Sequence, residues 1–471
     1  MSSHNLSRRQ FLRLAGLSVT ATAIVACVPP TAPQQQAAGE KAPVGEQVNI
    51  SFMGWGGPGE SQAVLDMIDR FEGENPDIKV SWLHTPQDYM PKLMSMVAAA
   101  TPPDTLFTPQ DFYHTFCRDG LMMDIQDQLD ADPVLNDPNY FLQPQEDRRS
   151  AYNGRWHGIG VCWVGQHMFY NADMFVDAGI EPPTTDPDKA WSWDHFLEVA
   201  RELTLDDNGN HPYDSGFDPD NIVQWGVNWS ATGGHFLASV PYMNGVLPLN
   251  PETNKFQYDD PAAVDALQKV ADLTNLHYVS PRSSNFNDLG MSVTQMLESR
   301  KVAMHIGGTY ELTWTHLIEA TLGVATPPKM KQTGAILVAD VRGAMAATKH
   351  PEAAYKWVRM TGDPVYQSTF LKIGLWWPNQ TSLMTPEGLN SWIDERKSPT
   401  EGVHPPGYYE LVDKYVRNHT DSWICPPDFP EAQQIITSSL EGLWNGNKTA
   451  QEAVQDAVPA ANEVLAKGAS S

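Results

Sequence analysis

From residue 48 onward, segments with the pattern of a β-strand alternate with segments that have the pattern of an α-helix. Strand segments show apolar and polar side chains in alternation, and helix segments repeat apolar side chains at i, i+4 and i+7. The strands are expected at 48–53, 78–83 and 105–108, and the helices at 60–74 and 89–100. Such an alternation predicts an α/β fold built on a parallel sheet.

The downstream sequence continues these patterns without an internal repeat. Ser192 is the expected N-cap of one helix, and Thr449 with Glu452 forms the expected capping box of the last. The chain of 471 residues exceeds one ordinary domain, so we expect two lobes. Further strands are expected at 156–161 and 167–170, and further helices at 172–179, 192–203, 261–277, 288–299, 309–318, 351–361, 363–372, 430–445 and 450–464.

The N-terminal residues predict export and lipid attachment. Arg8 and Arg9 precede Gln-Phe-Leu, which is the twin-arginine export pattern, and an apolar run from 14 to 26 is too short to span a bilayer. The run ends Ile-Val-Ala before Cys27, which resembles a lipobox. Residues 1–26 are therefore the expected signal peptide, Cys27 the expected lipidation site at the outer face of the cell membrane, and 27–46, rich in Pro, Gln and Ala, a flexible tether. An ordinary signal that happens to contain a cysteine is the alternative.

Charge and cysteine content narrow the function classes. The formal net charge of −26 disfavours nucleic acid, since phosphate binding needs clustered Lys and Arg. Beyond Cys27 there are only Cys117, Cys162 and Cys425, with no CxxC spacing. One disulfide among them is an open alternative, and buried free thiols are the favoured interpretation.

Most catalytic and metal-binding motifs are missing from the sequence, which has no G-x-S-x-G, no H-E-x-x-H and no Walker A. Gly54, Gly56 and Gly59 do spell G-x-G-x-x-G between a strand and a helix, as in a dinucleotide-binding loop. Pro58 removes a backbone N–H from that loop, and Leu83-His84-Thr85 stands where a ribose-binding acid belongs. An exported enzyme, either a nicotinamide-dependent oxidoreductase or a glycosidase, is therefore the alternative function class.

A series of segments resembles the extracellular solute-binding proteins of ABC importers, in the sugar-binding group that includes maltose-binding protein. The resemblance runs in order over about residues 47–465, and its segments are specific together rather than singly. Thr101 and Arg300 depart from glycines that are common in the family. The segments are Phe71–Val80, Ala98–Asp104, Tyr152–Ile159, Phe169–Phe175, Pro183 followed by Trp193–Phe196, Arg300–Met304 and Lys349–Ala354.

The resemblance implies a type II periplasmic-binding-protein-like fold, with two discontinuous α/β lobes joined by hinge strands around a ligand cleft. It implies 47–157 plus 305–348 for the first lobe and 158–304 plus 349–471 for the second. It also implies a monomer without a cofactor or metal that hands a small polar solute, foremost a mono- or oligosaccharide, to the permease subunits of an ABC importer.

Candidate ligand-binding residues follow from the matched segments and from the chemistry of sugars, which need hydrogen-bonding groups for hydroxyls and flat aromatic rings for C–H faces. An N-cap role is the alternative for Asp111, hinge packing for Trp163, and a solvated or structural role for Glu60 and Arg342. One of Trp376 and Trp377 is expected in the core. Glycerol phosphates and polyamines remain alternative ligands. The candidates are Trp55, Asp111, Trp163, Trp229, His235, Tyr310, Trp376 and Trp377, with Glu60 and Arg342 as weaker polar candidates.

Overall fold

The computed structural model describes residues 47–468 apart from 144, 399–400 and 424. The expected signal peptide, the tether and Cys27 lie outside the described residues. Residues from Glu46 onward form one compact unit by their contacts. This unit contains two five-stranded sheets, each with its own helices, and we call them the first and the second lobe.

The first lobe is built on the sheet β2-β1-β3-β15-β6, in which β1 pairs in parallel with β2 and β3 as the sequence predicts. Strand β15 runs antiparallel between β3 and β6. The strands are β1 (Val48–Gly54), β2 (Ile78–His84), β3 (Thr105–Pro109), β6 (Gly158–Gly160) and β15 (Asp340–Ala344), with a small hairpin of β4 (Ala151–Tyr152) and β5 (Arg155–Trp156) beside them.

Helix α2 shows how the sequence fixes the packing of this lobe. Pro58 occupies its first turn, where a missing N–H costs nothing, and the buried face runs from Ala63 to Phe71 at helical spacing. The helices of this part of the chain are α2 (Pro58–Glu74), α3 (Tyr89–Ala98), α4 (Gln110–Arg118), α5 (Gln126–Asp130), α6 (Gln145–Ser150), α14 (Pro351–Thr361), α15 (Pro364–Lys372), α16 (Pro386–Trp392), the 3₁₀ turn Thr381–Met384 and α17 (Tyr408–Glu410), which continues as the π-helix Leu411–Val416.

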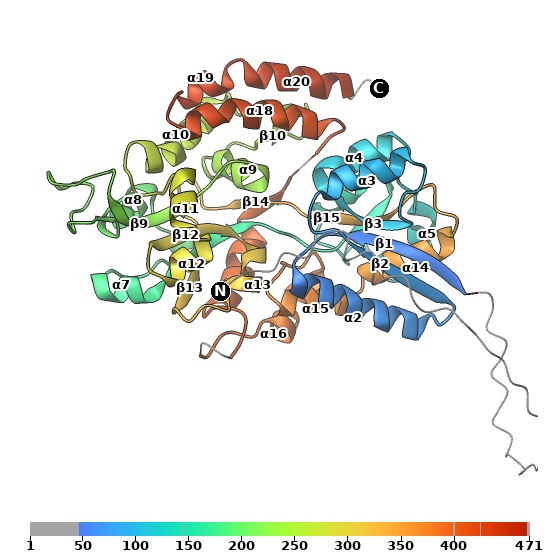
Figure 1. The fold of residues 1–471 in the computed structure, drawn as a ribbon. Coiled ribbons are helices and arrows are strands. Elements are labelled where there is room, and N and C mark those ends of the chain that lie inside the picture. The colour runs from blue at the N-terminus through green and yellow to red at the C-terminus, as the bar shows by residue number, and fades with distance from the viewer. Residues whose placement is uncertain (1–46, 144, 399–400, 424, 469–471) are drawn as a thin grey trace, which may run out of the picture. The chain divides into compact units, whose positions relative to one another are not determined.

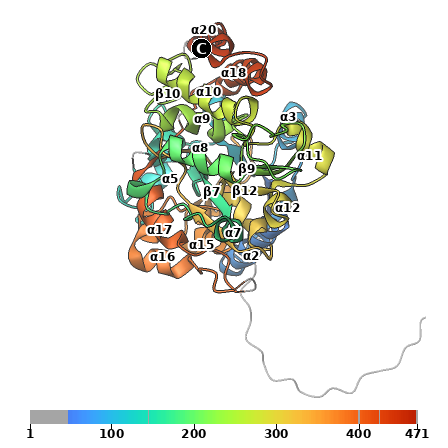
Figure 2. The same cartoon turned by 90° about the vertical axis from the view of Figure 1, so that its left-hand side faces the viewer.

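The second lobe is built on the sheet β13-β7-β12-β9-β8, where β12 is parallel to β9 and antiparallel to β7. Figure 2 faces this lobe, with α8 in front of the sheet. Its strands are β7 (Gln166–Asn171), β8 (Leu205–Asp206), β9 (Ile222–Trp229), β12 (Val302–Gly308) and β13 (Leu322–Ala325), and a separate pair joins β10 (Leu249–Asn250) to β11 (Lys255–Phe256).

The helices of the second lobe carry the caps that the sequence predicts. Ser192 accepts a hydrogen bond from the His195 amide, and Thr449 with Glu452 makes a reciprocal capping box. The helices are α7 (Ala172–Ala178), the 3₁₀ turn Pro187–Lys189, α8 (Trp193–Glu202), α9 (Gly234–Met243), α10 (Pro261–Asn275), α11 (Ser283–Leu289), α12 (Val293–Glu298), the 3₁₀ turn Thr309–Glu311, α13 (Leu312–Thr315), α18 (Phe429–Trp444), α19 (Ala450–Val454) and α20 (Ala457–Gly468).

Three crossing segments, residues 161–165, 335–339 and 417–428, connect the two lobes. Val164 and Val338 exchange backbone hydrogen bonds of 2.7 and 2.9 Å. Strand β14 (Ala335–Leu337) pairs in parallel with β16 (Thr420–Ser422), and Figure 1 shows β14 running between the two sheets. Paired extended segments of this kind are what a hinge between two lobes requires.

The expected lobe boundaries differ from the strand pairing in three places. Residues 158–160 form β6, which bonds to β15, so they lie in the first lobe rather than the second. Residues 305–308 and 322–325 belong to β12 and β13, which both bond to β7, so they lie in the second lobe rather than the first. Helices α14 and α15 follow residue 349 but pack on the first lobe, where the Trp357 ring meets Phe52 of β1 at 5.0 Å. Periodicity indicates which face of an element is buried, but not against which sheet, and this limits any boundary drawn from sequence.

Candidate functional site

The loop after β1 holds Trp55 at the carboxyl edge of the first sheet. Its indole is half-buried and meets Tyr89 and Phe107 edge to face, with ring centroids 4.8 and 5.2 Å apart. These contacts hold the ring in place while part of it stays exposed. Trp55 thus has the placement that an aromatic contact surface for a ligand needs, and its binding role stays a prediction.

Glu60 and Arg342 meet at the same edge, together with Asp340 at the start of β15. All three side chains are buried, so the solvated alternative for Glu60 and Arg342 is wrong. Arg342 Nη1 lies 2.9 Å from Asp340 Oδ2, but the angle does not make a hydrogen bond, and none of the three guanidinium nitrogens has a hydrogen-bond partner among the described residues. A buried polar atom without a partner costs about 1–3 kcal/mol, so these atoms form an unfilled polar cluster.

Electrostatics in this cluster favour a protonated Glu60. Burial raises the pKa of the Glu60 carboxyl to about 8, although the nearby Arg342 opposes that shift. Burial also raises the pKa of Asp340, again against the attraction of Arg342. Of the two acids, Asp340 is the one in the ion pair, so a protonated Glu60 adds an O–H donor to the cluster.

Asp111 lies in the first turn of α4 and is half-buried. The N-cap of that helix is Pro109, with no side-chain cap bond, so the N-cap alternative for Asp111 is wrong. Burial raises the pKa of the Asp111 carboxyl, while its own amide and that of Phe112 oppose the shift. Among the described residues, no hydrogen bond or ion pair joins Asp111 to the polar cluster of Glu60, Asp340 and Arg342, and Asp111 instead helps raise the pKa of the buried Cys425 thiol.

Trp163, Trp376 and Trp377 are all in the core. The Trp163 ring is 1 % exposed, and the Arg149 guanidinium stacks on it at 3.8 Å, which is the packing role given above as the alternative. Trp377 donates to the Tyr408 hydroxyl at 3.0 Å, and Trp376 stacks on Phe370 at 4.3 Å. The expectation that one of the adjacent pair faces a ligand is not met in this arrangement, because both rings are buried.

In the second lobe, Trp229, His235 and Tyr310 all follow the carboxyl ends of β9 and β12. Trp229 is buried against Trp193, and burial lowers the pKa of His235 to about 4. Tyr310 is half-buried, and burial raises its pKa to about 12. The indole nitrogen of Trp229 and Nε2 of His235 are buried without a hydrogen-bond partner among the described residues.

A buried hydrogen bond between Glu311 and His305 fixes the turn that carries Tyr310. Glu311 contacts His305 Nε2 at 2.8 Å and accepts the Gly308 amide at 2.9 Å. Burial raises the pKa of Glu311, but the His305 contact and the amide outweigh it and hold the pKa below its usual value. His167 lies beside this pair with both ring nitrogens unpartnered, and burial lowers its pKa to about 3.

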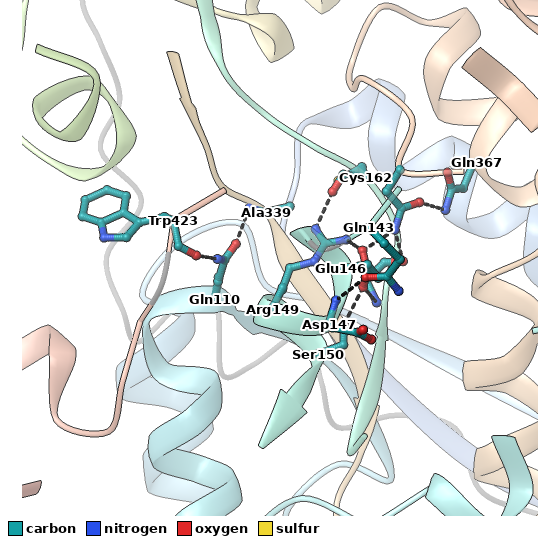
Figure 3. A network of polar contacts seen from close by, with 12 residues as sticks. Gln110, Gln143, Glu146, Asp147, Arg149, Ser150, Cys162, Ala339, Gln367 and Trp423 are labelled. Atoms are coloured by element: carbon teal, nitrogen blue, oxygen red, sulfur yellow. Dashed lines mark hydrogen bonds and ion pairs between the residues drawn. The ribbon is translucent and has the colours of Figure 1, made fainter. Parts of the chain in front are cut away.

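A second buried arginine, Arg149, has the opposite surroundings (Figure 3). Its guanidinium binds the Glu146 carboxylate and the Cys162 carbonyl, and Asn379 donates to Glu146 at 2.8 Å. Gln110 joins two crossing segments, since it donates to the Trp423 carbonyl and accepts the Ala339 amide at 3.1 Å. The network in Figure 3 therefore ties α4 and α6 of the first lobe to the crossing segments.

The glycine-rich loop has a packing explanation. A Cβ on Gly54 would lie 2.6 Å from the Phe107 and Trp82 rings, and one on Gly56, whose φ is +113°, would lie 2.2 Å from the Glu60 carboxylate. The Glu60 side chain thus fills the space under the loop at the start of α2. Its bulk occupies the place where such a loop holds a pyrophosphate, which argues against a dinucleotide.

Within the described part of the chain, no group of three or more His, Cys, Asp or Glu side chains is placed to hold a metal ion, and no helix is long and apolar enough to cross a membrane. Cys117, Cys162 and Cys425 are buried free thiols, as the favoured interpretation has it.

Comparison with known proteins identifies the family. The model of the bacterial extracellular solute-binding protein family matches residues 56–367. The chain belongs to this family. Its members bind solutes and are not enzymes, so neither alternative enzyme class describes this solute-binding protein. A curated relative, an uncharacterized lipoprotein in the oleD 5′ region of Streptomyces antibioticus, is 24% identical over 166 residues, which are 35% of each chain, so the match spans about a third of the relative's length.

Solved structures confirm the two-lobed α/β fold of this solute-binding protein. The ABC substrate-binding protein Lmo0181 from Listeria monocytogenes, in complex with cycloalternan, gives a TM-score of 0.74 at 20% identity over 89% of this chain and 99% of that one. The GacH receptor of Streptomyces glaucescens, solved unliganded and with acarbose, gives 0.69 at 18% identity, again over 89% and 99%. At these identities the likeness establishes the fold alone.

Sequence reasoning missed Asp340, Gln110 and the Arg149–Glu146 pair of this solute-binding protein. Asp340 and Arg342 stand two apart in a strand, an arrangement that places both on one face and was a readable signal. Glu146 and Arg149 stand three apart in a helix, which was also a readable signal. Gln110 carries none, because its partners are backbone atoms more than 200 residues away.

Proposed function

We propose that this solute-binding protein captures a carbohydrate between its two lobes and delivers it to the permease subunits of an ABC importer. The proposal goes beyond family membership in naming the ligand class and the place where it binds. It keeps the expectation that the protein acts as a monomer on the outer face of the cell membrane.

One observation carries the proposal. The carboxyl ends of β1 and β12 present half-exposed aromatic rings, Trp55 and Tyr310, and buried polar atoms without partners lie beside them. In open α/β sheets, ligands bind beyond the carboxyl ends of the strands. The unpartnered atoms are on Asp340 and Arg342 in the first lobe, and on Gln166, His167, Trp229, His235 and Thr309 in the second.

This combination of groups suits a sugar. The rings offer flat faces for C–H groups, and half of a ~200 Å² aromatic surface contributes about 2–3 kcal/mol at ~25 cal/mol/Å². Arg342 supplies donors and Asp340 an acceptor for hydroxyls. The complexes of Lmo0181 with cycloalternan and of GacH with acarbose support a carbohydrate as the ligand. A phosphate would need several cations, and the charge of Arg342 is already balanced by Asp340, although its donors make no hydrogen bond among the described residues.

Access to these atoms requires the lobes to separate. Arg342 is fully buried and Trp229 nearly so, which leaves no room for a sugar in this arrangement. The crossing segments at 161–165, 335–339 and 417–428 are the elements about which the lobe edges would open. The ligand would then replace the missing hydrogen-bond partners as the lobes close on it.

The anchor part of the proposal rests on Arg8, Arg9 and Cys27 in the sequence. Replacing Cys27 by Ala should move the protein from the membrane fraction to the soluble exported fraction. Cys117→Ala is the matched control, because that thiol is buried and free, and it should leave the protein on the membrane. Membrane retention of the Cys27→Ala variant would contradict the anchor.

A thermal-shift screen of the purified protein tests the ligand class. The compounds are cycloalternan, acarbose, malto- and manno-oligosaccharides, glycerol phosphates, polyamines and NAD(P). A ligand that binds only the folded state at 100 times its Kd adds about 2.7 kcal/mol of stability, which raises the melting temperature by a few degrees.

A shift with a carbohydrate that is recovered unchanged would support the proposal. A shift only with glycerol phosphates, polyamines or NAD(P), or chemical conversion of the sugar, would contradict it.

A further inference from the structure

Trp314 differs from the other tryptophans of this chain. All fifteen tryptophans lie in described residues, and Trp314 alone is exposed, with 42 % of its surface accessible. It lies in the short helix α13, directly after the turn that carries Tyr310. A single exposed apolar side chain needs no explanation by itself, so its placement beside Tyr310 is what matters.

Hydrogen bonds fix the backbone of the segment that carries Trp314. Thr309 donates its amide to the Gly165 carbonyl at 3.0 Å, which ties the turn to a crossing segment. The Thr313 hydroxyl donates to the Tyr310 carbonyl and the Thr315 hydroxyl to the Glu311 carbonyl, both at 2.8 Å. Together with the Glu311 contacts to His305 and Gly308, these bonds fix the backbone that carries the indole, and the Tyr310 ring packs against the indole itself, which lowers the entropy that a ligand would lose in ordering it.

Trp314 extends the aromatic surface that begins at Tyr310. The two residues are four apart, so they lie on one side of the turn, and their ring centroids are 5.7 Å apart with a 57° angle between the planes. The hydroxyl oxygen of Thr309, buried and without a partner, begins the same turn. Two tilted rings in succession offer faces to two consecutive units of a bent chain rather than to one flat ring.

We propose that the site takes an oligosaccharide rather than a monosaccharide, with Trp314 as the platform for a sugar unit beyond the one at Tyr310. This inference rests on the proposed carbohydrate function and adds the length of the ligand to it.

Isothermal titration with maltose-series and mannose-series sugars of one to four units tests this inference on wild type and Trp314→Ala. The variant should lose at least tenfold in affinity for the longer sugars and less than twofold for the shortest one that binds. Trp314→Phe, which keeps a ring, should restore part of the loss. Leu317→Ala is the matched control, since Leu317 is 71 % exposed three residues on, and it should bind every sugar as wild type does.

Each outcome decides between the two proposals. Equal affinity of wild type and Trp314→Ala at every length, or an equal loss at every length, would overturn the role of Trp314 while leaving carbohydrate binding intact. The melting temperature of each variant separates a loss of binding from a loss of folding. Failure of every sugar to bind the wild type would contradict the proposed function, and the inference about chain length with it.

Discussion

Two fully buried arginines of this solute-binding protein have opposite surroundings. Both guanidinium groups lie over an aromatic ring, Arg149 over Trp163 at 3.8 Å and Arg342 over Phe107 at 3.0 Å. Arg149 also binds Glu146 and the Cys162 carbonyl, so only its Nε lacks a partner among the described residues. Arg342 has Asp340 beside it, but none of its nitrogens makes a hydrogen bond to the part of the chain that the structure describes. The comparison suggests that the first arginine serves the structure, whereas the second keeps donors free for a ligand at the edge of the first sheet.

Removal of Arg149 should have the largest effect on stability. Arg149→Met leaves the Glu146 carboxylate buried and unpaired, and breaking such a pair costs about 3–5 kcal/mol. Denaturant unfolding measures the loss. The double variant Arg149→Met with Glu146→Leu is the control and should recover much of it, because no buried charge is left alone. A single variant as stable as wild type would show that the network in Figure 3 is not structural.

Removal of Arg342 should act on binding more than on stability. Arg342→Met gives up no hydrogen bond, and Asp340, whose pKa is already raised, can take up a proton when its partner is gone. We expect a smaller loss in unfolding free energy than for Arg149→Met, and at least a tenfold loss in sugar affinity by titration calorimetry. Unchanged sugar affinity would break the distinction between the two arginines.

The protonation of Glu60 should make the stability of the protein depend on pH. Burial raises its pKa from 4.5 to about 8, so the folded protein binds the proton more tightly than the unfolded chain does. The stability from this proton is fully present below pH 4.5 and is lost as pH rises toward 8. Glu60→Gln keeps the shape without the titration. Wild type should therefore lose stability relative to this variant between pH 4.5 and 8, measured by thermal unfolding in matched buffers.

The smallest effect is expected at an exposed ion pair. Arg155 is paired with Asp124 and Asp127, but its side chain is 48 % exposed. Exposed pairs contribute little net stability because solvent screens them, so Arg155→Gln should leave the denaturant midpoint and sugar binding close to those of wild type. A loss as large as that of Arg149→Met would show that burial does not set the ranking of these arginines.

The sequence predicts the elements better than it predicts their partners. The parallel strands at 48–53, 78–83 and 105–108 are confirmed, because period-two patterns reflect local burial. The helix expected at 288–299 is two helices separated at Gly290, and the one expected at 309–318 is a 3₁₀ turn with a short helix. The left-handed Gly290 ends the first of these helices, and buried polar contacts shape the turn in the second. The spacing of apolar residues contains no information about either feature.

The candidate site was predictable in its residue types and less so in its geometry. Trp55 and Tyr310 lie half-exposed at strand ends, where matched segments of the family place them. The sequence left packing open for Trp163 and placed one of Trp376 and Trp377 in the core, but it did not show that all three are buried, since a tryptophan near a glycine or proline serves equally as a ligand surface or as hinge packing. The unpartnered donors of Arg342 depend on which side chains enclose it, and only the folded structure defines those.

A crystal structure of the protein with the sugar that gives the largest thermal shift tests the central claim most directly. The account predicts the sugar between the carboxyl ends of the two sheets, with hydroxyls bonded to Asp340 or Arg342 and a ring face on Trp55 or Tyr310. A sugar bound elsewhere, with the nitrogens of Arg342 still without partners, would contradict it.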